Sequence, residues 1–71
     1  MVTDEAEKRR LIDEIISYAE NKPLSVSYIG TLKAMISMLP FSEEKASLLR
    51  AVNAKKPVKD VIVERAKKLR E

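Results

Sequence analysis

Apolar residues recur about every three or four positions in four segments of this chain, and polar or proline-containing breaks separate the segments. In the first segment they form one stripe, made of Leu11, Ile12, Ile15, Ile16 and Ala19, with Tyr18 at its edge. Such a stripe is typical of a helix whose apolar side faces a core. The pattern therefore predicts an all-α fold, a compact bundle of four short helices at about residues 4–20, 26–39, 43–53 and 57–70.

The breaks carry residues that begin and end helices. Thr3 or Asp4 can cap the first helix, and Ser42 can cap the third, because their side-chain oxygens accept from free backbone N–H groups. Asn21 can take the left-handed conformation that ends the first helix. Pro57 is predicted to open the fourth helix at its first position, where a missing N–H does no harm.

The second segment differs from the rest of the chain, because Lys33 is its only charged residue from position 24 to position 41. On a helical wheel one face is apolar and comprises Val26, Tyr28, Ile29, Leu32, Met35, Ile36 and Leu39. The opposite face is small and uncharged, with Ser27, Gly30, Thr31 and Ala34 at its centre. The alternation over residues 24–28 also fits a short strand, but no partner strand is visible, so a helix is favoured.

A helix without charge on any face is usually buried on every face. We therefore expect the helix over residues 26–39, helix 2, to be central, with the other three helices around it. Gly30 and Ala34 lie one turn apart, so another backbone could approach this face closely. A chain this short cannot surround the helix completely, which leaves open a homodimer or a partner protein against the small face.

The chain has 71 residues, which predicts a single helical domain over 1–71, near the lower size limit for folding alone. It contains no Cys and no His, so neither a disulfide nor a familiar zinc site can stabilise it. Without His or Cys the chain has no familiar catalytic triad and no thiol nucleophile, and with its one Gly placed in a helix it has no glycine-rich phosphate loop. We therefore expect no enzyme activity, no cofactor, no metal and no small-molecule substrate.

Charge is unevenly distributed along the chain. Residues 1–44 hold 5 basic and 8 acidic side chains, whereas residues 45–71 hold 9 basic and 3 acidic ones. A basic half favours an acidic partner such as nucleic acid, although it also fits an ordinary solvated surface. The acidic start and the lack of a long apolar run predict a cytoplasmic protein with no membrane contact. Many charged and few thermolabile residues favour a thermophilic source.

The segment from Ile15 to Ala34 resembles the 20-residue helix-turn-helix of DNA-binding regulators. Ala19 stands at the fifth position, which is small in that family, and Leu24, Ile29 and Leu32 stand at the apolar positions of the joint core. The segment departs from the family at the ninth position, where Pro23 replaces the usual Gly, and at the eighth, which is Lys22. The resemblance implies that the second helix would lie in a major groove.

Two functions follow from these patterns. The first is a non-enzymatic DNA-binding protein, a small regulator or an architectural protein, whose affinity comes mainly from phosphate contacts. The second is a protein-interaction module, an accessory subunit or inhibitor of a larger assembly, which would use the small face of helix 2 or Val63 on helix 4. The predicted contact residues for DNA or a larger protein are Ser27, Gly30, Thr31, Lys33, Ala34, Lys55, Lys56, Lys59, Lys67, Lys68 and Arg70.

Overall fold

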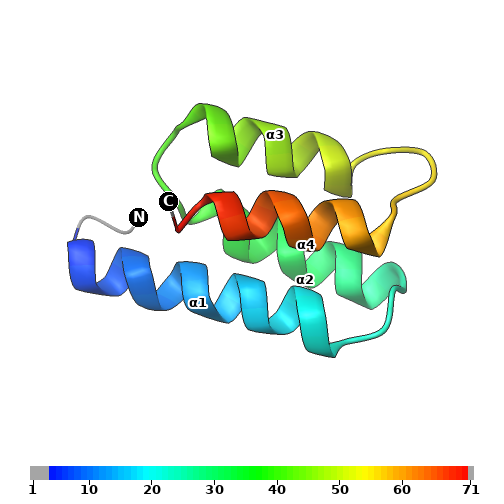
Figure 1. Cartoon of the computed structure of the whole chain (residues 1–71), viewed down its shortest axis with the longest axis horizontal. Helices are drawn as coiled ribbons and strands as arrows, with labels where there is room; N and C mark the ends of the chain where they lie inside the picture. Colours follow the sequence, from blue (N-terminus) through cyan, green and yellow to red (C-terminus); the bar gives the residue numbers. More distant parts are fainter. Residues whose placement is uncertain (1–3, 71) are drawn as a thin grey trace.

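A computed structural model of the chain describes residues 4–70, which form four α-helices (Figure 1). Helix α1 spans Glu5–Asn21, α2 spans Val26–Ser37, α3 spans Glu43–Val52 and α4 spans Lys59–Lys68. The predicted all-α bundle of four helices is confirmed. None of these helices is long and apolar enough to cross a membrane.

Three helices begin at side-chain caps, and two of these caps, Asp4 and Ser42, are residues that the sequence indicates. An Asp4 carboxylate oxygen accepts from the backbone N–H of Ala6 at 2.8 Å. The Ser25 hydroxyl accepts from Tyr28 N–H, and the Ser42 hydroxyl accepts from Lys45 N–H, each at 3.1 Å. Each contact satisfies one of the donors that a helix leaves unpaired at its start. The alternative cap, Thr3, lies outside the described residues.

The predicted end of the first helix and the predicted start of the fourth helix are both wrong. Asn21 is the last helical residue of α1 rather than a left-handed one, and no non-glycine residue from 4 to 70 has a positive φ. Lys22 follows in an extended conformation, and its N–H still donates to the Tyr18 carbonyl. Pro57 does not open α4, because the helix begins at Lys59 after Val58, which supplies no side-chain cap.

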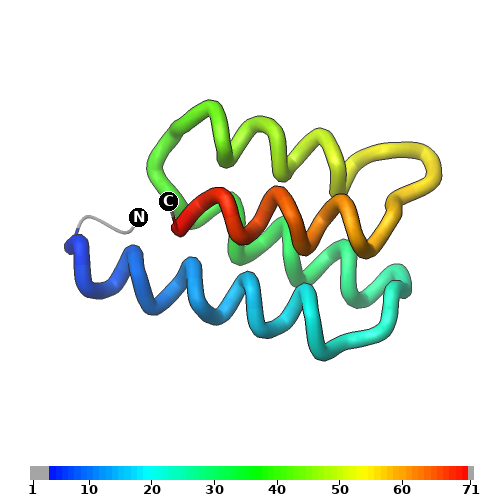
Figure 2. The backbone as a smooth tube through the Cα atoms, in the orientation of Figure 1, coloured from blue at the N-terminus to red at the C-terminus, as the bar shows by residue number. Residues whose placement is uncertain are grey.

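The four helices form a closed square. Each of α1 and α3 lies beside both α2 and α4, whereas the diagonal pairs α1–α3 and α2–α4 are not neighbours. In Figures 1 and 2, successive helices run in opposite directions, with α4 in front and α2 behind. The expectation that helix 2 is central is therefore wrong. In a square each helix packs against two neighbours, and one side of α2 stays open to solvent.

One apolar core lies inside the square. Its buried side chains come from all four helices and the α2–α3 connection: Leu11, Ile12, Ile15, Ile16, Ala19, Tyr28, Leu32, Ile36, Leu39, Leu48, Ala51, Val52, Ile62 and Ala66. The predicted stripe of α1 is buried as a whole. Val63, the predicted contact residue of helix 4, is partly buried and packs against this core. A contact surface centred on Val63 is thereby disfavoured.

Tyr28 joins the end of α1 to the start of α2. Its side chain is buried, and its hydroxyl donates to the Ala19 carbonyl at 2.8 Å. In a continuing helix that carbonyl would accept from residue 23, but residue 23 is Pro and has no N–H. The Tyr28 hydroxyl therefore replaces the missing donor, which satisfies a buried carbonyl.

Tyr18 lies against Tyr28, with ring centroids 5.7 Å apart and an interplanar angle of 29°. Burial raises the pKa of the Tyr28 hydroxyl above its ordinary value of 10.0, and the charge of the Tyr18 phenolate raises it further. The protonated Tyr28 hydroxyl is therefore the form that the folded chain favours. This is also the form that donates to Ala19.

Candidate functional site

The small face of α2 is open to solvent. We call Ser27, Gly30, Thr31 and Ala34 the α2 outer face, and all four residues are exposed. A Cβ added to Gly30 would meet no atom of another element within 4 Å, so no other part of residues 4–70 approaches this position closely. The predicted close packing of another helix of the chain against this face is wrong. These residues are available to something outside the described chain.

Lys33 is the only charged residue in α2, and it is exposed as well. The solvent side of a helix in a small protein normally carries many charged groups. The exposed part of α2 is instead nearly uncharged, and apolar side chains stand at both of its ends. Val26, its first residue, is 91% exposed, and Met38, directly after its last residue, is 50% exposed. A low content of charged residues is one feature of the core of a protein interface.

A groove lies beside the start of α2, at the end of the bundle where the α1–α2 and α3–α4 connections meet. We call it the end groove, and its volume is about 470 Å³. One wall comes from α2 and the residues before it: Leu24, Ser25, Val26, Ile29, Gly30 and Lys33. The other wall comes from the end of α3 and the α3–α4 connection: Val52, Asn53, Ala54, Lys55 and Pro57. The end groove therefore contains Gly30 from the α2 outer face.

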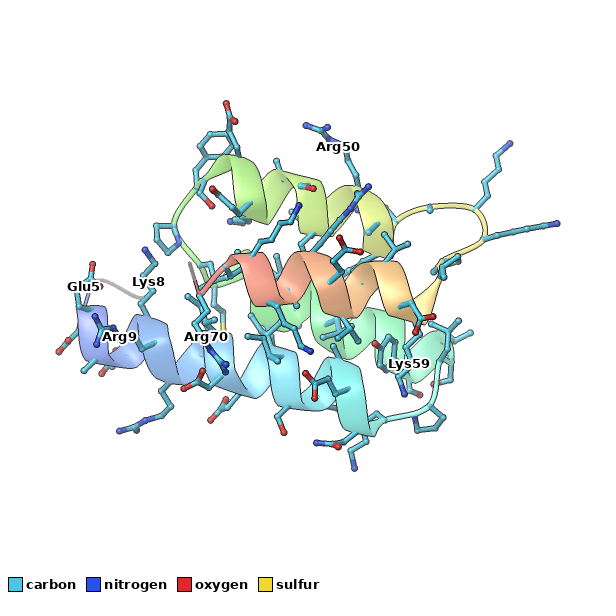
Figure 3. The ribbon with its side chains drawn as sticks, viewed as in Figure 1. Glu5, Lys8, Arg9, Arg50, Lys59 and Arg70 are labelled. Atoms are coloured by element: carbon cyan, nitrogen blue, oxygen red, sulfur yellow. The ribbon has the colours of Figure 1, made fainter. Side chains whose placement is uncertain are left out.

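The structure brings only part of the predicted cation set together. Lys33 and Lys55 line the same groove, and the exposed Lys56 follows Lys55 in the α3–α4 connection. Lys59 lies at the start of α4, at this same end of the bundle, and is partly buried (Figure 3). The exposed Asp60 lies in the first turn of α4 at the same end, so this end of the bundle carries both signs of charge.

The remaining three cations lie at the end of α4 and are directed elsewhere. Lys67 Nζ pairs with Glu20 Oε1 at 3.3 Å, and Arg70 Nη2 pairs with Asp13 Oδ1 at 2.7 Å. Figure 3 shows Arg70 pointing toward α1. Lys68 lines a separate depression with Phe41 and Glu44. The predicted set of contact cations is thus divided between two regions, and two of its members already have acidic partners.

The residues of the helix-turn-helix resemblance occupy mixed environments. Ala19 and Leu32 are buried, and Ile29 is partly buried. Leu24 is 44% exposed, so its predicted place in a joint core is wrong. In Figures 1 and 2, α1 and α2 run side by side in opposite directions, whereas the two helices of that motif cross at about 90–120°. The resemblance to DNA-binding regulators stays a prediction.

Sequence reasoning missed several residues of this surface. It assigned Val26 to the core, because a helical wheel treats every turn as equally covered by neighbours. Val26 is the first residue of α2, and the buried residues of that helix begin only at Tyr28. The sequence does not mark Asn53 and Ala54 as part of this surface, since only the fold places the α3–α4 connection beside α2.

The side chains described offer few groups for metal binding: within residues 4–70 no cluster of three or more Asp or Glu residues could hold an ion. No protein-family model, curated protein or solved structure matches this chain.

Proposed function

We propose that the chain is a non-enzymatic protein-interaction module that binds a larger protein through the α2 outer face and the end groove. The observation that carries this proposal is an exposed helix with almost no charge. Interfaces between proteins have few charged residues at their centre, whereas DNA-binding surfaces are strongly positive. Lys33 is the only cation that α2 offers, which is far fewer than a duplex contact normally uses.

The exposed apolar side chains support the same proposal. Large apolar side chains that are exposed singly are ordinary on protein surfaces, but groups of them mark interaction sites. Leu24 and Val26 lie together at the start of α2, and Met38 lies directly after its other end. A partner that covers this helix would remove their apolar surface from water, and that burial stabilises a complex.

Site-specific photo-crosslinking in the cells that make the protein tests this proposal. A photoreactive amino acid at Thr31 places the probe on the α2 outer face, and the matched control places it at Glu64, which is exposed on the diagonal helix α4. We expect an adduct from position 31 that protease destroys and nuclease leaves intact, with no equivalent adduct from position 64. An adduct that nuclease destroys, or no adduct from position 31, would contradict the proposal.

DNA binding is the second candidate, and one specific observation favours it. The N-termini of α2 and α4 lie at the same end of the bundle as Lys55 and Lys56 (Figure 1). Helix N-termini carry partial positive charge and attract phosphates. If this candidate is correct, duplex affinity falls steeply with added salt, and Lys55→Glu with Lys56→Glu weakens it further. No detectable binding to any duplex at low salt would exclude it.

A further inference from the structure

Two exposed large apolar side chains line the end groove. Of the five large apolar residues that are exposed between positions 4 and 70, Leu24 and Val26 line the groove. A third, Val58, follows directly after Pro57, which also lines it. The other two, Met38 and Phe41, lie in and around the α2–α3 connection, away from the groove. Among the described concavities, the end groove is the one to which α2 contributes most residues: Val26, Ile29, Gly30 and Lys33.

Gly30 forms an opening in the α2 wall of this groove. Neither the backbone nor the packing of the chain requires glycine there, because its φ is not positive and the space beside it is empty. A side chain at position 30 would project into that space. With glycine, the space stays free, and the side chain of a docked partner can lie directly against the α2 backbone.

The charges around the groove favour a partner segment with negative charge. Lys33 stands on the α2 wall and Lys55 on the opposite wall, and no Asp or Glu lines either wall. The two ion pairs within residues 4–70 use Lys67 and Arg70, so neither groove lysine takes part in them. Two cations on facing walls of an apolar groove complement a partner that is apolar along one face and acidic at its edges.

We propose that the end groove binds an acidic amphipathic helix of a partner protein. Apolar side chains at i, i+3 or i+4, and i+7 would enter the groove beside Gly30, and carboxylates at the edges of that face would lie near Lys33 and Lys55. A groove of about 470 Å³ accommodates a few such side chains. This inference rests on the proposed function and names the class of partner segment.

Selection from a displayed library of random peptides tests the inference. The library carries peptides of about 16 residues, some four helical turns, and the full chain is immobilised as the target. We expect enrichment of peptides that have apolar residues at helical spacing and a net negative charge. One enriched peptide is then synthesised, its affinity is measured by fluorescence anisotropy, and its contacts are mapped by amide chemical-shift changes.

Matched variants assign the binding to the groove. Gly30→Leu fills the groove and should lower the affinity about tenfold or more, and because position 30 is open the variant folds normally. Lys33→Glu combined with Lys55→Glu should have an effect of similar size. The control is Arg9→Glu combined with Lys68→Glu, which makes the same change in charge at exposed positions outside the groove. We expect the control to leave the affinity unchanged.

The outcomes separate this inference from the proposed function. Enrichment of basic or proline-rich peptides, or an affinity that Gly30→Leu leaves intact, overturns the acidic helix while the Thr31 crosslink can still show a protein partner. Self-association of the chain that Gly30→Leu abolishes identifies a second copy as the occupant and also overturns it. Duplex DNA that shifts the groove amides, together with no enriched peptide, overturns it in favour of nucleic acid.

Discussion

Replacing Gly30 by Ala should make the protein more stable. Gly30 is the fifth of the 12 residues of α2, so it lies inside the helix rather than at a frayed end. Glycine in a helix interior is about 0.5–1 kcal/mol less favourable than alanine, because it loses more backbone freedom on folding. The new methyl group meets nothing within 4 Å, so no clash opposes this gain.

The expected gain is the full propensity difference, about 0.5–1 kcal/mol in the free energy of unfolding. For a domain of this size, 1 kcal/mol shifts the melting temperature by about 4–8 °C, so we expect a rise of about 2–8 °C. Circular dichroism during thermal and urea unfolding measures both quantities. The m-value should not change, since the surface exposed on unfolding stays the same.

Ala34→Gly is the matched control, because Ala34 is exposed one turn further along the same face. It should lower the stability by about the amount that Gly30→Ala raises it, and the double variant should return close to the original value. A loss of stability in Gly30→Ala would refute the reasoning, since it would mean that another group packs against position 30. No change in either variant would show that α2 is not a stable helix in this region.

Three further predictions concern the contacts between helices. Tyr28→Phe should lower the free energy of unfolding by about 1–3 kcal/mol in urea unfolding, because the buried Ala19 carbonyl loses its donor; an unchanged value would show that water replaces the hydroxyl. Because the pKa of Tyr28 is raised in the folded chain, its contribution to stability is complete below about pH 10 and is lost as the pH rises through the folded-state pKa. The difference in unfolding free energy between the parent and Tyr28→Phe should therefore decrease above pH 10, and a difference that grows would contradict the assigned direction. Arg70→Ala should change the stability by less than about 0.5 kcal/mol in the same assay, because the Arg70 and Asp13 side chains are 62% and 61% exposed; a larger loss would show that the pair is more than a surface contact.

Local signals predicted the helices, but they did not predict how the helices are arranged. Asp4 and Ser42 mark the starts of two helices correctly because capping depends only on nearby backbone groups. The predicted helix start at Pro57 is wrong because such local signals do not fix the exact first residue. A proline two residues before a helix fits the sequence as well as a proline at its first position. The near absence of charge on α2 predicts burial on every side, whereas the helix is only half covered.

The candidate site was predictable only in its α2 half. The small outer face is visible on a helical wheel, since Ser27, Gly30, Thr31 and Ala34 share one side of a single helix. The opposite wall of the end groove begins at Val52, 19 residues after Lys33, and its position depends on how α3 and α4 pack. The pairing of Lys67 with Glu20 depends on the same packing, and it removes a cation that the sequence alone presents as available.

The closed square of helices has a consequence for how the chain reaches its fold. Three of the four neighbouring pairs follow one another in sequence, and only α1 and α4 must meet over a long separation. Closing a long loop loses more chain entropy than closing a short one, so the α1–α4 pair should form last.

The start of α1 and the end of α4 share one depression, lined by Glu5 and Leu69 among others. A short linker could therefore join them, and the chain could be opened at Pro40 in the α2–α3 connection instead. Such a circular permutant keeps all four helix contacts but makes α2 and α3 the distant pair. The order of assembly would then change, while the folded molecule and its end groove stay the same.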